Sequence, residues 1–423
     1  MTIKVCDAIM GSGKSSAAIN FMNEHPERKF IYITPFLEEA SRIKYSCPML
    51  NFREPSSNLP EFGFRKYQHT LELIKEGHNI ASTHNMFTRY TTEMVESIKA
   101  QGYTLIVDEA MEVLNPSSDS PSDIMALVAT GNLKQVGDML VTGDNPTYQR
   151  GRLDHIVHLS KGNRIVNIPD SIDPDKKVGY LYWLFSKEIF ESFSEVYLLT
   201  YMFDCQMIKY YFDMNDMDFE YIGVRRDDSG YHFSDSMEYV PEYTASLSDK
   251  IHIFENKKLN SIGNNKNALS YTWFTRSAGA EAKEKLKSNL HSYFMYHFKT
   301  VPGNKKLWAS FKCGEKWLKA KGYARNHIAF NAKATNEYRD KQVLAYCVNI
   351  FMQPSEKVYL LNKNIDVLED KYALSVMLQW IWRSAIRDGK EIWIYIPSRR
   401  MRNLLKDWIK ETEEYYKSYQ ERK

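Results

Sequence analysis

The hydrophobic positions in the first half of the chain form short continuous apolar runs, separated by segments with helical spacing. The runs are residues 3–6, 29–34, 80–83, 103–107 and 195–200. Runs of this length, rich in β-prone residues, are typical of buried strands in a parallel sheet. Residues 15–22 instead place apolar side chains three and four positions apart, which predicts a helix. Strands alternating with helices predict a doubly wound α/β domain.

The same alternation returns in the second half of the chain. Helices are predicted at residues 280–298 and 374–386, and strands at 306–311, 327–330, 343–348 and 391–396. The last helix is amphipathic, and its apolar positions are Met401, Leu404, Leu405, Trp408 and Ile409. We therefore predict a second α/β domain, related to the first by the order of its elements and not by a sequence repeat.

Two polar segments interrupt these patterns. Residues 114–180 begin with a loop rich in Ser, Pro and Asp, and they predict an elaboration of the first domain. Residues 216–266 contain short alternating pieces, which predict a β-rich insertion. We accordingly place domain 1 at residues 1–215 and domain 2 at residues 216–423.

Composition adds little to this picture. The chain has 423 residues, 43% of them hydrophobic, and a net charge of +3, which suits a two-domain globular protein without demanding or excluding nucleic acid. Its five cysteines have no zinc-like spacing. No apolar run approaches the roughly 18 residues of a membrane span. With no leader expected before the first strand, we expect a cytoplasmic protein, in the host cytoplasm if viral.

Residues 8–15 fit the phosphate-binding P-loop pattern, with Ala8 in place of the first glycine. The candidate phosphate-binding residues are Gly11, Ser12, Gly13, Lys14 and Ser15. Small residues before a helix allow backbone N–H groups to surround phosphate oxygens at the positive end of the helix dipole. Lys14 would reach the outer phosphates and Ser15 would ligate Mg²⁺, so we expect ATP and Mg²⁺ as cofactors. The alternative is an ordinary glycine-rich turn between a strand and a helix.

Asp108 and Glu109 directly follow the clearest apolar run. At the carboxyl end of a parallel strand, the carboxylate of Asp108 would hold Mg²⁺, and Glu109 would orient and deprotonate the attacking water. The alternative is a solvated acidic pair that opens a helix.

Gln379, Arg383 and Arg387 are spaced four residues apart, so on one helix they would share a face. No acidic partner lies four residues from either arginine within that helix. Two planar guanidinium groups on one face suit a γ-phosphate, so these three residues are candidate catalytic residues. Either arginine could be the finger, although Arg383 fits better, and a basic solvent-facing surface is the alternative.

These segments resemble, in order, the motifs of superfamily 2 (DEAD/DEAH-like) helicases. Asp108-Glu109-Ala110-Met111 resembles the D-E-x-x box. Residues 379–387 are similar to Q-x-x-G-R-x-x-R, with Trp382 in the glycine position and one extra residue before Arg387. The resemblance implies nucleic-acid contacts by five residues: Thr34, Pro35, Thr83, Thr335 and Asn336. It also implies that Thr200 couples hydrolysis to movement.

The resemblance implies two RecA-like doubly wound domains with the P-loop in the first. It further implies an ATP-dependent helicase or translocase of the compact phage or viral replication type, hydrolysing ATP between the domains. The expected partner is single-stranded or duplex nucleic acid, DNA being favoured, with other replication proteins as candidate partners and no membrane. A viral DNA-packaging motor and an ATP-gated nucleic-acid clamp or loader remain alternatives.

Overall fold

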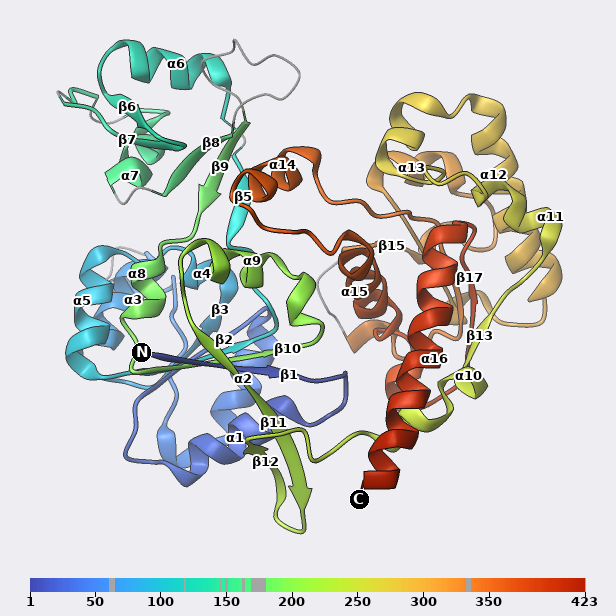
Figure 1. Cartoon of the computed structure of the whole chain (residues 1–423), viewed down its shortest axis with the longest axis horizontal. Helices are drawn as coiled ribbons and strands as arrows, with labels where there is room; N and C mark the ends of the chain where they lie inside the picture. Colours follow the sequence, from blue (N-terminus) through green and yellow to red (C-terminus); the bar gives the residue numbers. More distant parts are fainter. Residues whose placement is uncertain are drawn as a thin grey trace. The chain divides into compact units, whose positions relative to one another are not determined.

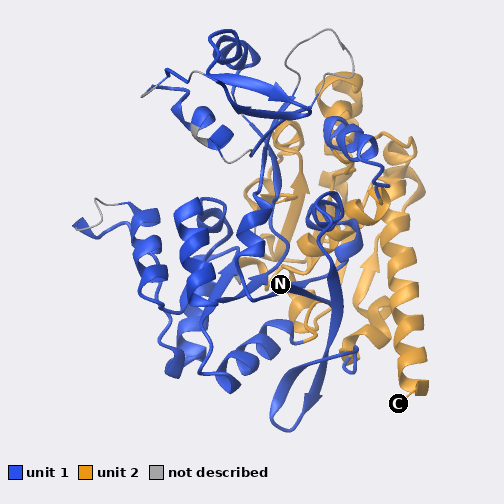
Figure 2. Cartoon of the chain, turned by 60° about the vertical axis from the view of Figure 1, so that its left-hand side comes forward, with its two compact units in different colours: residues 1–9, 13–239, 353–367 blue, residues 10–12, 240–352, 368–423 orange. Residues whose placement is uncertain are grey.

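A computed structural model describes residues 1–60, 65–117, 119–144, 146–148, 151–161, 164–168, 180–331 and 336–422 of the chain. The chain forms two compact units, shown in different colours in Figure 2. Unit 1 contains residues 1–9, 13–239 and 353–367. Unit 2 contains residues 10–12, 240–352 and 368–423. Each unit is built on its own parallel sheet.

The sheet of unit 1 has seven strands (Figure 1). Their order is β12 (Gly230–Ser234), β11 (Phe219–Asp227), β1 (Thr2–Asp7), β10 (Glu195–Thr200), β4 (Thr104–Asp108), β2 (Phe30–Thr34) and β3 (Ile80–Thr83). Every neighbouring pair from β11 to β3 is parallel, and β12 alone runs antiparallel to its neighbour. The five strands predicted in the first half correspond to β1, β2, β3, β4 and β10, so the α/β class is confirmed for this unit.

Helices cover both faces of this sheet. They are α1 (Lys14–Glu24), α2 (Leu37–Ser46), α3 (Lys66–Lys75), α4 (His84–Phe87), α5 (Thr92–Gln101), α8 (Lys187–Glu191) and α9 (Met207–Met214). Successive strand residues point to opposite faces, so each strand contributes to two cores. Leu105 and Val107 of β4 pack in the core that contains α3, α4, α5, α8 and α9. Ile106 packs instead in the core that contains α1 and α2.

The division between the domains differs from the one expected at residue 215. β11 and β12 lie in the segment that we interpreted as an insertion of domain 2, yet β11 pairs with β1, from Ile3 with Phe219 to Cys6 with Ile222. The hairpin therefore extends the first sheet, and unit 1 continues to Tyr239. The segment looks polar because much of β11 and β12 is exposed or half-buried.

Residues 114–184 build a smaller subdomain on unit 1. Its antiparallel sheet has the order β5 (Leu114–Pro116), β9 (Tyr180–Leu184), β8 (Ile165–Ile168), β7 (Met139–Thr142) and β6 (Leu133–Val136). Its helices are α6 (Pro121–Ala129) and α7 (Asp154–Lys161), which share one small core with this sheet. The expected elaboration at 114–180 thus has a sheet of its own.

Helix α14 (Pro354–Asn362) packs against this subdomain, although the chain on either side of it belongs to unit 2. Tyr359 joins an apolar cluster with Leu114, Val166, Ile168 and Tyr182. The hydroxyls of Tyr182 and Ser355 are 2.6 Å apart, and Lys363 Nζ lies 2.6 Å from Asp138 Oδ2. A cavity of about 250 Å³ opens beside this contact. The helix is therefore anchored by apolar packing, a hydrogen bond and an ion pair.

Helix α14 carries a buried carboxyl group, that of Glu356, whose ionisation is unfavourable in the folded chain. Burial raises the pKa of Glu356 from its usual 4.5 to about 7, and the nearby charge of Glu112 acts in the same direction. Because the pKa of Glu356 is higher in the folded chain than in the unfolded chain, the protonated carboxyl stabilises the fold at acidic pH. This stabilisation is lost as the pH rises from 4.5 through 7. We expect Glu356→Gln to raise the free energy of unfolding at pH 8 by about 1–3 kcal/mol, measured by denaturant or thermal unfolding.

At pH 5 the same variant should exceed the wild type by less than about 1 kcal/mol, because Glu356 is then protonated in the folded chain and pH 5 lies only slightly above the unfolded pKa of 4.5. Glu411→Gln is the matched control, since Glu411 is an exposed residue of helix α16 (Arg399–Arg422). An equal gain for Glu356→Gln at pH 5 and pH 8 would show that the effect does not arise from ionisation.

The sheet of unit 2 is parallel throughout, in the order β13 (Ile251–Ile253), β17 (Ile392–Tyr395), β16 (Val343–Tyr346), β14 (Lys306–Ser310) and β15 (His327–Ala329). Its helices are α10 (Leu247–Lys250), α11 (Lys257–Asn260), α12 (Ala280–Ser292), α13 (Lys312–Leu318), α15 (Glu369–Ile381) and α16 (Arg399–Arg422). The helix predicted at 280–298 is α12 followed by a π-helix, Tyr293–His297. The predicted second α/β sheet is confirmed. In the described part of the chain, no helix is long and apolar enough to cross a membrane.

Candidate nucleotide-binding site

The candidate P-loop, residues 8–15, connects β1 to the first turn of α1. Gly11 and Gly13 have φ values of 76° and 83°, a left-handed conformation that glycine adopts without steric strain. Among the described residues, helix α1 has no acidic residue in its first turn and no side-chain cap for its positive end. Within the described residues, the hydroxyl of Ser12 is buried and makes no hydrogen bond. The loop therefore has the backbone shape and polarity of an anion site.

Lys14 and Ser15 begin α1 and point to different parts of this region. Lys14 Nζ donates hydrogen bonds to the carbonyl oxygens of Ala8 and Ile9, the second at 3.1 Å. Burial lowers the pKa of Lys14. Ser15 Oγ donates to Asp108 Oδ2 at 3.0 Å, although 93 residues separate the two in sequence. The fold thus brings together the P-loop and the acidic pair, which were identified separately in the sequence.

Asp108 is the last residue of β4, and a second hydroxyl also reaches it. Tyr32 Oη, from the adjacent strand β2, donates to Asp108 Oδ2 at 2.7 Å. Burial raises the pKa of Asp108, and the hydrogen bonds from Tyr32 and Ser15 act in the opposite direction. The sequence analysis missed Tyr32 because an aromatic residue inside an apolar strand is normally interpreted as part of the hydrophobic core. Its position two residues before Thr34 was the only available signal.

Glu109 follows Asp108 in an unusual backbone conformation. Its φ is 63°, which a residue with a side chain rarely adopts, and its side chain is exposed. The backbone N–H of Glu109 donates to the carbonyl of Leu199 at 2.9 Å, and that of Ala8 donates to Thr200 at 3.0 Å. These bonds fix the strand ends on both sides of β10. Strained residues of this kind concentrate at functional sites.

Three further predicted residues lie at the carboxyl ends of neighbouring strands. Thr34 ends β2, is fully buried, and its hydroxyl has no hydrogen-bond partner among the described residues; Pro35 follows it, half-buried. Thr83 ends β3 and accepts a hydrogen bond from the N–H of Met86, capping α4. Thr200 ends β10 and donates to Gln206 Oε1 at 2.8 Å. One edge of the first sheet therefore carries all the predicted residues of this unit.

The predicted residues of unit 2 are not arranged as expected. Helix α15 ends at Ile381, and Arg387 lies in a separate 3₁₀ turn, Ala385–Asp388. Gln379 and Arg387 are exposed whereas Arg383 is buried, so the expectation of one shared helical face at 374–387 was wrong. The charge of Arg383 acts on the phenols of Tyr338 and Tyr346, whose pKa values burial raises. Thr335 and the side chain of Asn336 lie outside the described residues.

Comparison with known sequences identifies relatives of the whole chain. Residues 245–409 match a family described as the YonV C-terminal Rossmann-like domain. Over 420 residues the chain is 37% identical to the SPbeta prophage-derived uncharacterized protein YonV of Bacillus subtilis (strain 168), covering 96% of this chain and 98% of that protein. The chain belongs to the YonV family.

Solved structures similar to this member of the YonV family are distant in sequence. Xpd4 of S. tokodaii is 11% identical, with 96% of this chain and 94% of that chain covered and a TM-score of 0.48. An XPD helicase is 10% identical, with the same coverage and a TM-score of 0.43. The DUF1998 helicase MrfA bound to DNA and AMPPNP is 10% identical, with a TM-score of 0.33. That match covers 93% of this chain and 45% of the helicase chain. Similarities this remote carry no argument about activity.

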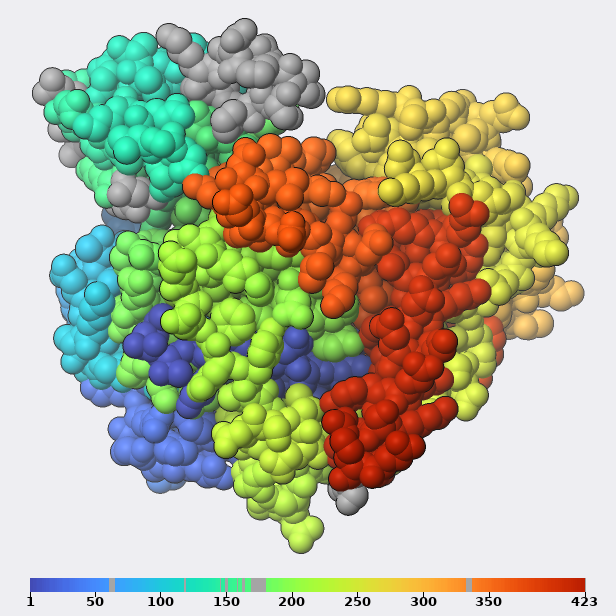
Figure 3. Space-filling model, viewed as in Figure 1, coloured from blue at the N-terminus to red at the C-terminus, as the bar shows by residue number. Residues whose placement is uncertain are grey.

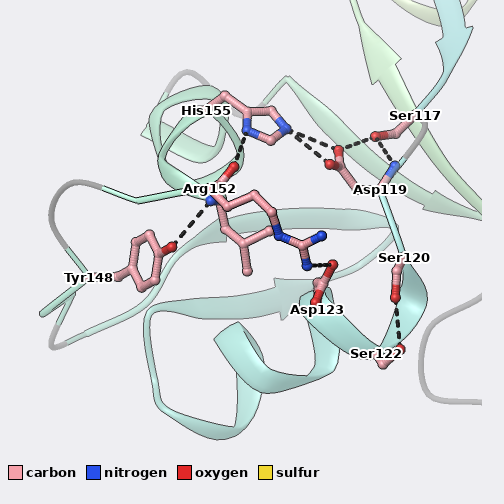
Figure 4. Close-up of polar contacts among 9 residues, drawn as sticks. Ser117, Asp119, Ser120, Ser122, Asp123, Tyr148, Arg152 and His155 are labelled. Carbon is pink, nitrogen blue, oxygen red and sulfur yellow. Dashed lines mark hydrogen bonds and ion pairs between the residues drawn. The ribbon is translucent and has the colours of Figure 1, made fainter.

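Polar clusters that combine Ser, His and an acidic residue also occur elsewhere in this YonV-family chain. In the subdomain of unit 1, Ser117 donates to Asp119, and His155 Nε2 lies 3.1 Å from Asp119 Oδ1 (Figure 4). The carboxylate lies between the hydroxyl and the imidazole, so the histidine does not contact the serine as a general base must. The cluster instead connects the loop before α6 to α7.

The second cluster, in unit 2, has the order that nucleophilic catalysis requires. Ser310 Oγ lies 3.1 Å from His327 Nε2, and His327 Nδ1 lies 3.4 Å from Glu315 Oε1. Ser310, however, is fully buried, and burial lowers the pKa of His327. A substrate has no access to this hydroxyl, and the three side chains join β14, β15 and α13.

Proposed function

We propose that this chain is an ATP-dependent nucleic-acid helicase or translocase that acts on DNA. The observation that carries the proposal is the 3.0 Å contact between Ser15 and Asp108, next to the P-loop lysine. A hydroxyl and a carboxylate that converge behind a phosphate-binding loop are the two protein ligands that P-loop enzymes offer to Mg²⁺.

The residues present fit ATP and Mg²⁺. Ser15 and Asp108 supply oxygen ligands, which Mg²⁺ prefers, and bound Mg²⁺ would neutralise charge on the outer phosphates. Gly11, Ser12 and Gly13 would surround the phosphates with backbone N–H groups, and Lys14 would neutralise their charge. Glu109, exposed beside Asp108, would accept a proton from the attacking water.

We further propose that nucleic acid crosses the strand ends of both units. Thr34, Pro35 and Thr83 lie at the same edge of the sheet as Asp108, and Thr335 and Asn336 would extend the track in unit 2. Contacts of this kind reach the sugar–phosphate backbone, so binding would be largely independent of sequence. Thr200, bonded to Gln206 beside the P-loop strand, would couple hydrolysis to movement. Arg383 or Arg387, with Gln379, would reach the γ-phosphate as the two units close on it.

The prophage origin of the YonV relative supports a role in phage DNA replication or recombination in the host cytoplasm. A translocase would travel along one strand, whereas a clamp or loader would bind without displacing a complementary strand.

ATP hydrolysis should rise strongly when single-stranded DNA is added. The test measures turnover alone and with single-stranded DNA, single-stranded RNA or duplex, together with displacement of a labelled strand. DNA binding should weaken as salt rises, because the contacts are to phosphates. Stimulation without strand displacement would indicate a clamp or loader, and a rate that no nucleic acid changes would contradict the helicase proposal.

A further inference from the structure

The β11–β12 hairpin lies beside the P-loop, on the side away from the acidic strand. β1 has β11 as one neighbour and β10 as the other, and β4, which carries Asp108, lies beyond β10. Pairing of β1 with β11 ends at Cys6 and Ile222, whereas β11 and β12 stay paired as far as Asp227 and Gly230. The hairpin therefore continues past the end of β1, and its tip projects from the surface of unit 1 (Figure 3).

Tyr231 of β12 holds the hairpin against the P-loop. A Cβ atom added to Gly13 would lie 2.1 Å from the Tyr231 ring, so the ring packs directly on the glycine backbone. Asn20 Nδ2 of α1 also donates to the Tyr231 carbonyl at 3.0 Å. Glycine at position 13 is thus required by Tyr231 as well as by its own φ value.

Arg226 and Tyr239 complete a cation–aromatic cluster with Tyr231. The guanidinium carbon of Arg226 is 5.3 Å from the centre of the Tyr231 ring and 5.6 Å from that of Tyr239. The two rings meet edge to face, with centres 5.4 Å apart. Arg226 is exposed, whereas both tyrosines are half-buried. A flat cation backed by two aromatic rings therefore faces solvent next to Gly13.

The direction of a bound nucleotide follows from the order of the strands. In the proposed site, the outer phosphates point toward Ser15 and Asp108, on the β4 side of β1. The nucleoside must then leave the loop on the other side, where the hairpin lies. Guanidinium planes and aromatic rings are the groups on which proteins stack nucleobases.

We propose that Arg226, Tyr231 and Tyr239 form the nucleobase platform of this site, with the base stacked on the guanidinium plane of Arg226. The inference rests on the proposed function, since it names the groups that hold the nucleoside of the same nucleotide. Stacking contributes affinity for the base and leaves the reacting phosphates untouched. Loss of the platform therefore weakens ATP binding without slowing the chemical step.

The test uses the full chain with Arg226→Ala and Tyr239→Ala, leaving Tyr231 in place because it supports Gly13. Each variant should raise the KM for ATP about 5- to 100-fold, the range expected for one lost stacking contact, with kcat nearly unchanged. Inhibition by inorganic tripolyphosphate, which has no base, should stay the same. Tyr45→Ala is the matched control, because Tyr45 is an 81% exposed tyrosine on α2.

Arg226→Lys separates stacking from charge. Lysine keeps the positive charge and loses the plane, so we expect it to behave like Arg226→Ala. Full activity in Arg226→Lys, or an equal loss of tripolyphosphate inhibition in the alanine variants, would overturn the platform and indicate a phosphate contact. An unchanged KM in an active enzyme would overturn the platform alone. A wild-type chain that neither binds nor hydrolyses ATP would overturn the proposed function as well.

Discussion

Lys14→Ala is expected to reduce ATP turnover by about 100- to 1,000-fold, the usual effect of removing one charged or hydrogen-bonding group from a developing anion. The ammonium group of Lys14 lies within the loop, bonded to the carbonyls of Ala8 and Ile9. In the proposed site these bonds are exchanged for bonds to phosphate oxygens. Turnover of purified variant and wild type under saturating ATP is the measurement.

Lys29→Ala is the matched control, because Lys29 is a half-buried lysine of the same unit that contacts Gln101 rather than the loop. It should keep wild-type turnover. Circular dichroism and the unfolding midpoint must show that Lys14→Ala remains folded. A folded Lys14→Ala variant with near-normal turnover would rule out the P-loop as the hydrolytic site.

Arg383→Ala is expected to cause the other large loss, about 1,000-fold or more in kcat, because an arginine finger contributes about 10³–10⁵ to phosphoryl transfer. ATP affinity should change far less, since the guanidinium acts on charge that develops in the transition state. Single-turnover hydrolysis and equilibrium binding of ATP, measured on the same preparation, separate the two effects.

Arg387→Ala is the comparison that the chain itself offers. Arg387 is exposed in the 3₁₀ turn, so its replacement should leave the fold intact, whereas Arg383 is buried and its variant needs an unfolding curve beside the kinetics. Arg383→Lys keeps charge at the buried position and should remain inactive, because lysine lacks the planar fork. A large loss of kcat in Arg387→Ala, with a near-normal kcat in Arg383→Ala, would show that Arg387 is the arginine finger.

The predicted strands of unit 1 were found because each is signalled within a few residues. A continuous apolar run between polar turns marks a strand buried on both faces, and β1, β2, β4 and β10 all have this form. The P-loop pattern, which remains a prediction, is equally local, since its glycines, lysine and serine are adjacent in sequence. Such patterns need no knowledge of which elements become neighbours.

Features that depend on distant partners were missed. The hairpin β11–β12 is polar because it is exposed, and only its pairing with β1 shows that it belongs to the first sheet. Tyr32 reaches Asp108 because β2 lies next to β4. Neither relation can be read from a single segment.

The end of α15 shows a tertiary bond overriding a local pattern. Apolar and basic spacing continues to Arg387, yet the N–H of Ala385 donates to the carbonyl of Lys341, next to β16, rather than to the preceding helical turn. Ser384 correspondingly bonds to Ile381 in a tighter turn, at 3.0 Å. The helix therefore stops where the backbone finds a partner outside it, which separates Gln379 from Arg387.

The course of the chain through α14 bears on how this protein can be divided. Residues 353–367 leave unit 2, complete the apolar cluster of the subdomain with Tyr359, and return. A fragment ending at residue 239 would expose Leu114, Ile168 and Tyr182, and a fragment starting at residue 240 would carry a helix without its docking surface. The two units are consequently not interchangeable modules, and a gene fusion or domain exchange that joined chains at that point would have to bring a compatible α14 from the other parent.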